Sequence, residues 1–207
     1  MLDFHTHNLN SDDESLINAS LSNFSPKSSR MYSAGIHPWH TACISANDLK
    51  RLSDCVALPQ VKLIGETGID AIKGASRERQ TEIFIYHINL SEELRKPLLI
   101  HSVRTDNDII ALRKRLHPAM PWVIHGFRGN ENIARQLLNA GIYISFGEYF
   151  NIKAVAETPL DKIFVESDDA KTPLADIYSR VAMAHGILPE MLVTQVARNF
   201  KALLAVK

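Results

Sequence analysis

The chain has 207 residues, and its 23 Lys and Arg balance its 23 Asp and Glu, so the formal net charge is zero. This length suffices for one domain with a substantial core. The neutral balance excludes a global positive field that would attract nucleic acid or membranes. No apolar stretch is long enough to cross a bilayer, and a histidine motif already begins at residue 5, so we expect no signal peptide. We therefore expect a cytoplasmic protein, with no membrane contact and no stable protein partner.

Short apolar runs alternate with helical patterns along most of the chain. The runs predict strands at residues 2–6, 15–21, 31–36, 61–66, 97–101, 121–125, 142–146 and 163–167. The helical patterns cover residues 46–57, 77–95, 106–116, 130–139, 151–156, 174–185 and 190–204. No linker or repeat divides the sequence, so residues 1–207 are expected to form a single barrel domain.

The first thirty residues break this alternation. Between His7 and Met31 there is room for one strand, at residues 16–21, but hardly for a full helix as well. We infer an α/β fold, a TIM-like (β/α)8 barrel whose first crossover helix is reduced to a turn or loop. A seven-stranded barrel with residues 12–22 helical is the alternative, because short apolar runs separate helix from strand poorly.

Six of the predicted strands end at or beside a side chain that can bind a metal. These side chains are His5 and His7, His37, Glu66, His101, His125 and Asp168. A single histidine of this kind is commonly structural, but a set of six strand ends is better explained by one common site. In a parallel barrel the carboxyl ends of the strands meet at one mouth, and the sequence therefore predicts a metal site there.

The number and type of these side chains favour two ions over one. His5 and His7 are alternate residues and point to the same side of a strand, while Glu66 offers a carboxylate that can bridge two cations. With His101, His125 and Asp168 the set has six candidate ligands, which exceeds what one tetrahedral zinc ion requires. It suits a pair of ions about 3.5–4 Å apart, as in two-metal hydrolases.

With these motifs in place, the chain resembles the TatD-like metal-dependent hydrolases, a branch of the amidohydrolase-type barrels. The resemblance runs through nearly the whole length. The matching motifs are His5-Thr6-His7, Gly35-Ile36-His37-Pro38, Ile64-Gly65-Glu66-Thr67-Gly68-Ile69-Asp70, Arg79-Gln80 with Phe84, Ile100-His101-Ser102, His125-Gly126-Phe127-Arg128-Gly129, Val165-Glu166-Ser167-Asp168 and Asn199-Phe200.

The resemblance implies a binuclear site and a hydrolytic reaction. His5, His7 and Asp168 would hold one metal, His101 and His125 the other, and Glu66 would bridge them. The family includes deoxyribonucleases, which often act from a 3′ end. A water molecule activated by two divalent ions would attack the substrate, and Asp168, or alternatively Glu66, would accept its proton. The ions are expected to be Zn²⁺, Mn²⁺ or Mg²⁺.

The chain departs from the family pattern after Asp168, where the usual Pro-Tyr-Leu and proline-rich loop are replaced by residues 169–173 and a helix. That loop normally shapes the substrate pocket, so the substrate does not follow from the resemblance. Four residues next to the proposed site are candidate substrate contacts: His37, Arg104, Arg128 and Lys171. The three cations follow metal-site motifs and would neutralise phosphate oxygens.

These observations favour a divalent-metal phosphodiesterase or deoxyribonuclease that acts on DNA ends or on small phosphodiesters. One alternative is hydrolysis of an amide, ester or lactone, as in related barrels, although those often use a modified lysine where Glu66 stands here. Another is a binding or scaffold protein that keeps a metal for stability. Retention of all six candidate ligands argues against a purely structural site.

Overall fold

A computed structural model of the protein describes residues 1–11 and 14–206. Its strands form one parallel sheet in sequence order, β1 to β8. The strands are β1 (Asp3–Thr6), β2 (Ser15–Ala19), β3 (Met31–Ala34), β4 (Val61–Asp70), β5 (Leu98–Val103), β6 (Trp122–Ile124), β7 (Tyr143–Phe146) and β8 (Ile163–Val165). The eight-stranded prediction is therefore confirmed.

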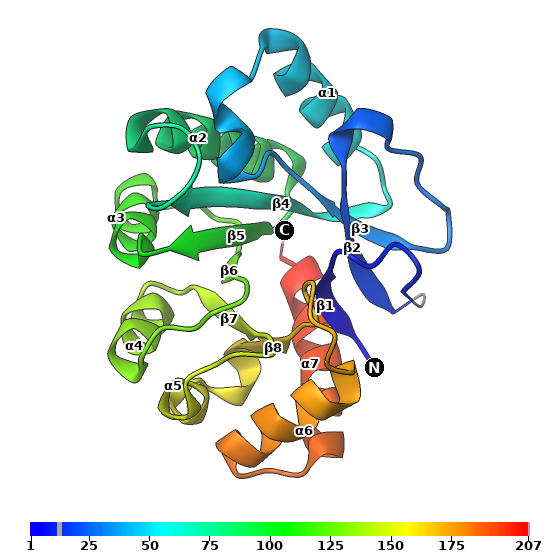
Figure 1. Ribbon diagram of the computed structural model, residues 1–207, viewed down its shortest axis with the longest axis vertical. Helices are drawn as coiled ribbons and strands as arrows, with labels where there is room; N and C mark the ends of the chain where they lie inside the picture. The colour runs from blue at the N-terminus through cyan, green and yellow to red at the C-terminus, as the bar shows by residue number, and fades with distance from the viewer. Residues whose placement is uncertain (12–13, 207) are drawn as a thin grey trace.

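The helices surround this sheet, as Figure 1 shows. They are α1 (Ala46–Val56), α2 (Arg77–Leu94), α3 (Asp106–Leu116), α4 (Glu131–Asn139), α5 (Ile152–Glu157), α6 (Leu174–His185) and α7 (Pro189–Leu204), with short 3-10 helices η1 (Leu21–Asn23), η2 (Pro38–Cys43) and η3 (Leu160–Lys162). The predicted helix boundaries lie within one residue of these ends. The helix predicted after residue 173 is also present, as α6.

The first part of the chain differs from the later strand–helix units. Residues 15–19 form a strand, so the seven-stranded alternative with residues 12–22 helical is wrong, although residues 12–13 lie outside the described part. Among the described residues, no helix connects β1 to β2, and only η1 lies between β2 and β3. The barrel mouth is therefore not flanked by full helices on this side.

The sheet closes into a barrel where β1 meets the end of β8. Thr6 and Asp168 form a parallel bridge. Asp168 N donates to His5 O at 2.9 Å, and His7 N donates to Asp168 O at 3.0 Å. These two bonds place the first histidine motif beside the last acidic motif, although more than 160 residues separate them in the sequence.

Apolar side chains fill the space between strands and helices. Phe84 of α2 packs against Trp122 of β6 with ring centroids 5.5 Å apart, and both are buried. Phe4 of β1 contacts Phe200 of α7, which fixes the last helix against the first strand. No helix in the described part of the chain has the length and apolarity needed to span a membrane.

Candidate metal centre

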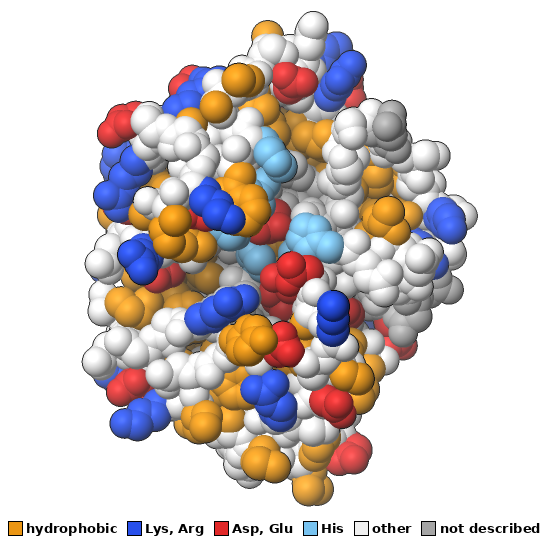
Figure 2. All heavy atoms as spheres, viewed as in Figure 1, with side chains coloured by type: hydrophobic (Ala, Val, Ile, Leu, Met, Phe, Trp, Pro, Cys, Tyr) orange, Lys and Arg blue, Asp and Glu red, His pale blue; other side chains and the backbone are white. Residues whose placement is uncertain are grey.

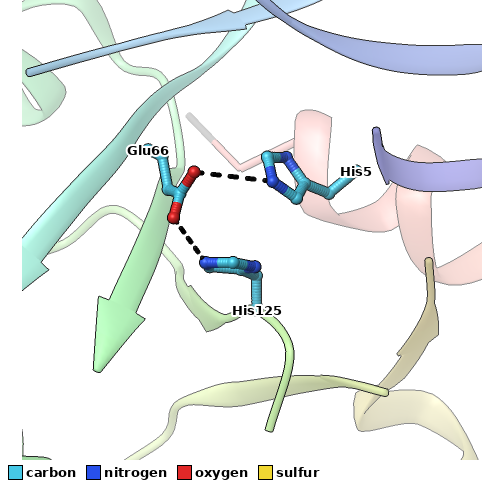
Figure 3. Close-up of side chains that lie close together, drawn as sticks. All are labelled: His5, Glu66 and His125. Carbon is cyan, nitrogen blue, oxygen red and sulfur yellow. Dashed lines mark hydrogen bonds and ion pairs between the residues drawn. The ribbon is translucent and has the colours of Figure 1, made fainter. Parts of the chain in front are cut away.

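The carboxylate of Glu66 is the common partner of the histidines at the barrel mouth. Its Oε1 lies 2.9 Å from Nδ1 of His101, 2.8 Å from Nε2 of His125 and 3.0 Å from Nε2 of His37. Its Oε2 faces Nε2 of His5 at 3.6 Å and Nε2 of His7 at 3.5 Å. The two oxygens therefore face two different groups of imidazoles, and Figure 3 shows one oxygen of Glu66 paired with His5 and the other with His125.

Two glycines allow Glu66 to reach this position. Gly65 and Gly68 flank it in β4 with φ angles of 142° and 140°. A Cβ at Gly65 would lie 2.2 Å from the carbonyl oxygen of Leu99, and one at Gly68 would lie 2.1 Å from that of His101. Only glycine fits such a close approach of two backbones. The Gly-Glu-Thr-Gly sequence therefore places Glu66 beside the histidine of the neighbouring strand.

His5, His7 and Asp168 form the second side of the centre. Oδ1 of Asp168 lies 3.6 Å from Nε2 of His5 and 3.4 Å from Nε2 of His7. His5 is fully buried, and neither of its ring nitrogens has a hydrogen-bond partner within the described structure. A buried, unsatisfied imidazole costs free energy unless another group, such as a metal ion, satisfies it.

The donor atoms fit divalent cations. Four overlapping groups of three residues bring their donor atoms within 4.8 Å of one another. Together the groups contain all the predicted ligands, and they also include His37 and Glu166. The groups are His5–Glu66–His125, His5–His7–Asp168, His37–Glu66–His101 and His125–Glu166–Asp168. A mixed imidazole and carboxylate set of this kind suits zinc or manganese. Which residue binds which ion, and how many ions bind, stay predictions.

Burial and charge shift the pKa values of the centre in opposite directions. Burial lowers the pKa of His5 to about 3, so its imidazole is neutral and keeps a lone pair for a cation. Burial alone would raise the pKa of Glu66, but His125, His101 and His37 hold it well below its ordinary value. Burial raises the pKa of Asp168, which His125 only partly opposes. Asp168 is thus a better proton acceptor than an ordinary aspartate.

Two acidic residues that the sequence analysis did not assign to the site complete it. Glu166 is fully buried, lies 3.1 Å from Nδ1 of His125 and accepts a hydrogen bond from Ser145 Oγ. Asp70 Oδ2 lies 3.2 Å from Nε2 of His101 and accepts a hydrogen bond from Trp39 Nε1 at 2.6 Å. Both belong to motifs noted in the sequence, and their place in those motifs was the available signal.

Helix α2 holds the end of β4, which carries Asp70, and the η2 segment, which carries Trp39. The Gln80 side chain is buried, accepts a hydrogen bond from Asp70 N at 2.7 Å and donates to the carbonyls of Asp70 and Lys73. Arg79 donates to the carbonyls of Thr41 and Ile44, at 3.3 and 3.0 Å. The Arg79-Gln80 pair of the sequence motif therefore positions the loop after β4 and the η2 segment.

The centre opens into a cleft of about 780 Å³. Its floor contains Glu66, His101 and His125, and its walls come from residues 18–22 and from the 35–51 segment. Figure 2 shows histidine side chains gathered at the middle of this face, beside acidic side chains. His37 lines the cleft, as expected for a substrate contact, and its role stays a prediction.

The three predicted substrate-binding cations lie outside this cleft. Arg104 and Lys171 are exposed and line neither cavity described for the protein. Arg128 is also exposed, and its guanidinium lies over the ring of Tyr149, 5.3 Å from the centroid, beside a smaller depression. Each of the three follows the end of a strand, but none lines the large cleft, so their contact with substrate stays a prediction.

Several known proteins are similar to this chain in sequence. The sequence model of the family described as "TatD related DNase" matches residues 10–205. A hydrolase of Buchnera aphidicola (strain Bp), named "Uncharacterized metal-dependent hydrolase", is 33% identical over 192 residues, which cover 82% of this chain and 72% of that protein. The similarly named YcfH of Escherichia coli K12 is 30% identical over 196 residues, covering 84% and 73%.

Solved structures share the fold. YJJV of Escherichia coli, described as a TatD homolog, superposes with a TM-score of 0.80 at 20% identity, over 93% of this chain and 86% of that chain. An amidohydrolase from Saccharomyces cerevisiae superposes with a TM-score of 0.73 at 14% identity, over 91% and 88%. At these identities the likeness concerns the fold alone. The family model and the sequence relatives go further: this chain belongs to the TatD-related DNase family and is a metal-dependent hydrolase.

Proposed function

We propose that this protein hydrolyses phosphodiester bonds and acts as a deoxyribonuclease on DNA ends or on short phosphodiesters. The observation that carries the proposal is the position of Glu66, whose two oxygens face two separate groups of imidazoles. This arrangement suits a carboxylate bridge between two cations, the type of centre used for in-line displacement at phosphorus. The family model, described as that of a DNase, supports the same reaction class.

The residues of the centre have different proposed roles. His5, His7 and Asp168 would hold one ion, His101 and His125 the other, and Glu66 both. When bound, such ions lower the pKa of a water molecule and neutralise charge that builds up on the phosphoryl oxygens. Asp168 is only half-buried and lines the cleft, which supports its carboxylate as the acceptor of the proton from the attacking water. His37 lines the same cleft and stays a candidate substrate contact.

The neutral balance of the chain favours ends and short substrates over long duplex DNA. Long duplex binding relies on many phosphate contacts made by Lys and Arg. The walls of the cleft contain acidic side chains as well as Arg51, so they offer no extended basic track. Frayed or single-stranded ends need fewer such contacts.

The test is cleavage of 3′-end-labelled single- and double-stranded DNA by metal-stripped protein supplied with Mg²⁺, Mn²⁺ or Zn²⁺. We expect stepwise, metal-dependent shortening that is absent in a folded His101→Ala variant. A bis-aryl phosphodiester and an aryl ester are assayed in parallel. Turnover of the ester without either phosphodiester would refute the proposal and indicate an esterase or amidase.

A further inference from the structure

The cleft extends well beyond the proposed metal centre. Besides the floor residues it is lined by residues 18–22, at and beyond the end of β2, and by Asp48 and Arg51 of α1. Its volume of about 780 Å³ lies in the range of small-molecule sites, roughly 300–1,000 Å³. The centre itself occupies one part of this space, so the remainder is available for the part of a substrate that does not react.

The walls between the centre and α1 are largely apolar. Ala19, Leu21, Ile36 and Ile44 contribute to this lining. Trp39 stands at the rim with 43% of its surface exposed, and its indole is held by the hydrogen bond to Asp70. A fixed aromatic ring and aliphatic walls suit a sugar and a base better than a chain of phosphates.

Arg51 is the only Lys or Arg among the described residues that line this cleft. Its guanidinium makes no ion pair within 4.0 Å with any residue in the described part of the chain. The nearby Asp48 accepts hydrogen bonds from Ser45 N at 2.9 Å and Ser45 Oγ at 2.6 Å in the cap of α1, and its charge interacts with that of Arg51 without a direct ion pair. The cleft therefore contains a guanidinium, carried by α1, that forms no direct ion pair with a described residue.

Lys50, the neighbouring cation on α1, differs from Arg51 both in ion pairing and in its position relative to the cleft. Lys50 is ion-paired with Asp54 at 3.0 Å, and it does not line the cleft. The contrast distinguishes Arg51 from Lys50, the other cation of α1. A guanidinium presents a fork of donors that matches a phosphate or carboxylate in two-point contact.

We propose that the cleft binds nucleotide-sized phosphodiesters carrying a second anionic group, and that Arg51 binds this remote group. The inference rests on the proposed phosphodiesterase function and names its substrate class. One nucleoside between the scissile phosphodiester and a terminal phosphate would lie along the apolar walls. The remote phosphate then contributes to binding without taking part in the reaction.

The experiment compares thymidine dinucleotides that carry no terminal phosphate, a 5′-phosphate or a 3′-phosphate, with Mn²⁺-loaded protein. For the wild type we expect a terminal phosphate at one end to lower KM about tenfold with little change in kcat, since a charge-assisted hydrogen bond contributes this much. In Arg51→Ala the KM with the favoured terminal phosphate should become about equal to the KM without a terminal phosphate. Arg51→Lys should keep part of the tenfold difference. The control Lys50→Ala should keep all of it.

A binding measurement separates this inference from the proposed function. Thymidine 3′,5′-bisphosphate and the two monophosphates, which contain no diester, are titrated calorimetrically into wild type and Arg51→Ala. Loss of affinity in the variant for the bisphosphate alone supports the Arg51 site even if no phosphodiester is cleaved. If phosphodiesters are cleaved but the terminal phosphate affects neither KM nor binding, the function stands and the Arg51 inference is overturned. The Arg51 inference is also overturned if a terminal phosphate lowers KM by the same factor in wild type and in Arg51→Ala.

Discussion

The imidazole of His125 lies between two buried carboxylates, with Glu66 2.8 Å from its Nε2 and Glu166 3.1 Å from its Nδ1. His101 repeats the arrangement, with Glu66 at its Nδ1 and Asp70 at its Nε2. Each histidine thus has one ring nitrogen facing the shared carboxylate and the other facing an outer one. An outer carboxylate fixes the ring orientation and raises the basicity of a metal ligand.

Replacement of Glu166 by Gln should weaken metal binding. The glutamine keeps the size of the side chain but removes the charge that supports His125, so we expect metal affinity to fall about 10–100-fold. Competition with a chromophoric chelator measures this directly. The control is Glu148→Gln, because Glu148 bonds to Thr172 rather than to a histidine. Unchanged affinity in a folded Glu166→Gln protein would contradict the supporting role.

Replacement of Asp168 by Asn separates proton transfer from metal binding. If Asp168 accepts the proton of the attacking water, turnover should fall about 100-fold or more, the usual contribution of such a group, while metal content falls much less. Measuring kcat and metal content on the same preparation distinguishes a proton acceptor from a residue that only binds metal. Asp169→Asn, which removes a charge from the next residue, should have a smaller effect. Parallel loss of turnover and metal would make Asp168 a ligand only.

The buried His87 should make stability depend on pH. Its Nε2 accepts a hydrogen bond from Ile36 N at 2.9 Å, its Nδ1 lies 2.7 Å from Ile83 O, and burial lowers its pKa to about 4. Because the folded pKa is below the ordinary value of 6.5, the unfolded chain takes up the proton first as the pH falls. This group's contribution is therefore complete above about pH 6.5 and is lost down to about pH 4, by up to roughly 3 kcal/mol.

Urea unfolding of metal-stripped protein from pH 7 to pH 4 measures this contribution. The difference in unfolding free energy between wild type and His87→Gln should shrink as the pH falls. The exposed His117, replaced by Asn to suit its positive φ of 47°, serves as the control and should follow wild type. A constant difference between wild type and His87→Gln across this range would contradict the assignment.

Replacement of Gly68 by Ala should destabilise the protein far more than the same change at Gly141. A Cβ at Gly68 would lie 2.1 Å from the carbonyl oxygen of His101, so strands β4 and β5 must separate. We expect a cost of about 2–5 kcal/mol. Gly141 also has a positive φ, 75°, but no atom within 4 Å of the new Cβ, so it should cost about 1 kcal/mol. Equal denaturation midpoints for the two variants would show that the contact at Gly68 relaxes without cost.

Much of the fold could be predicted because its signals are local. Strand boundaries followed from apolar runs and helix boundaries from helical periodicity, and the structure shows a local capping box of Ser45 with Asp48 at the start of α1. The convergence of His5, Glu66, His101 and His125 followed from the rule that parallel strands meet at one mouth. By itself, the sequence determined the barrel, the family and the candidate ligands. Hydrophobic periodicity and the residue types at strand ends are local features that can be recognised from residues close together in the chain.

Only the tertiary structure decided which side chains surround those ligands. Asp70 reaches His101 because β4 continues pairing with β5 beyond Glu66, through Gly68. Glu166 reaches His125 across the barrel interior, and Arg51 reaches the cleft because η2 and α1 fold over the mouth. These contacts depend on strand register, burial and loop path, which join residues far apart in the chain. No local pattern in the sequence specifies such distances.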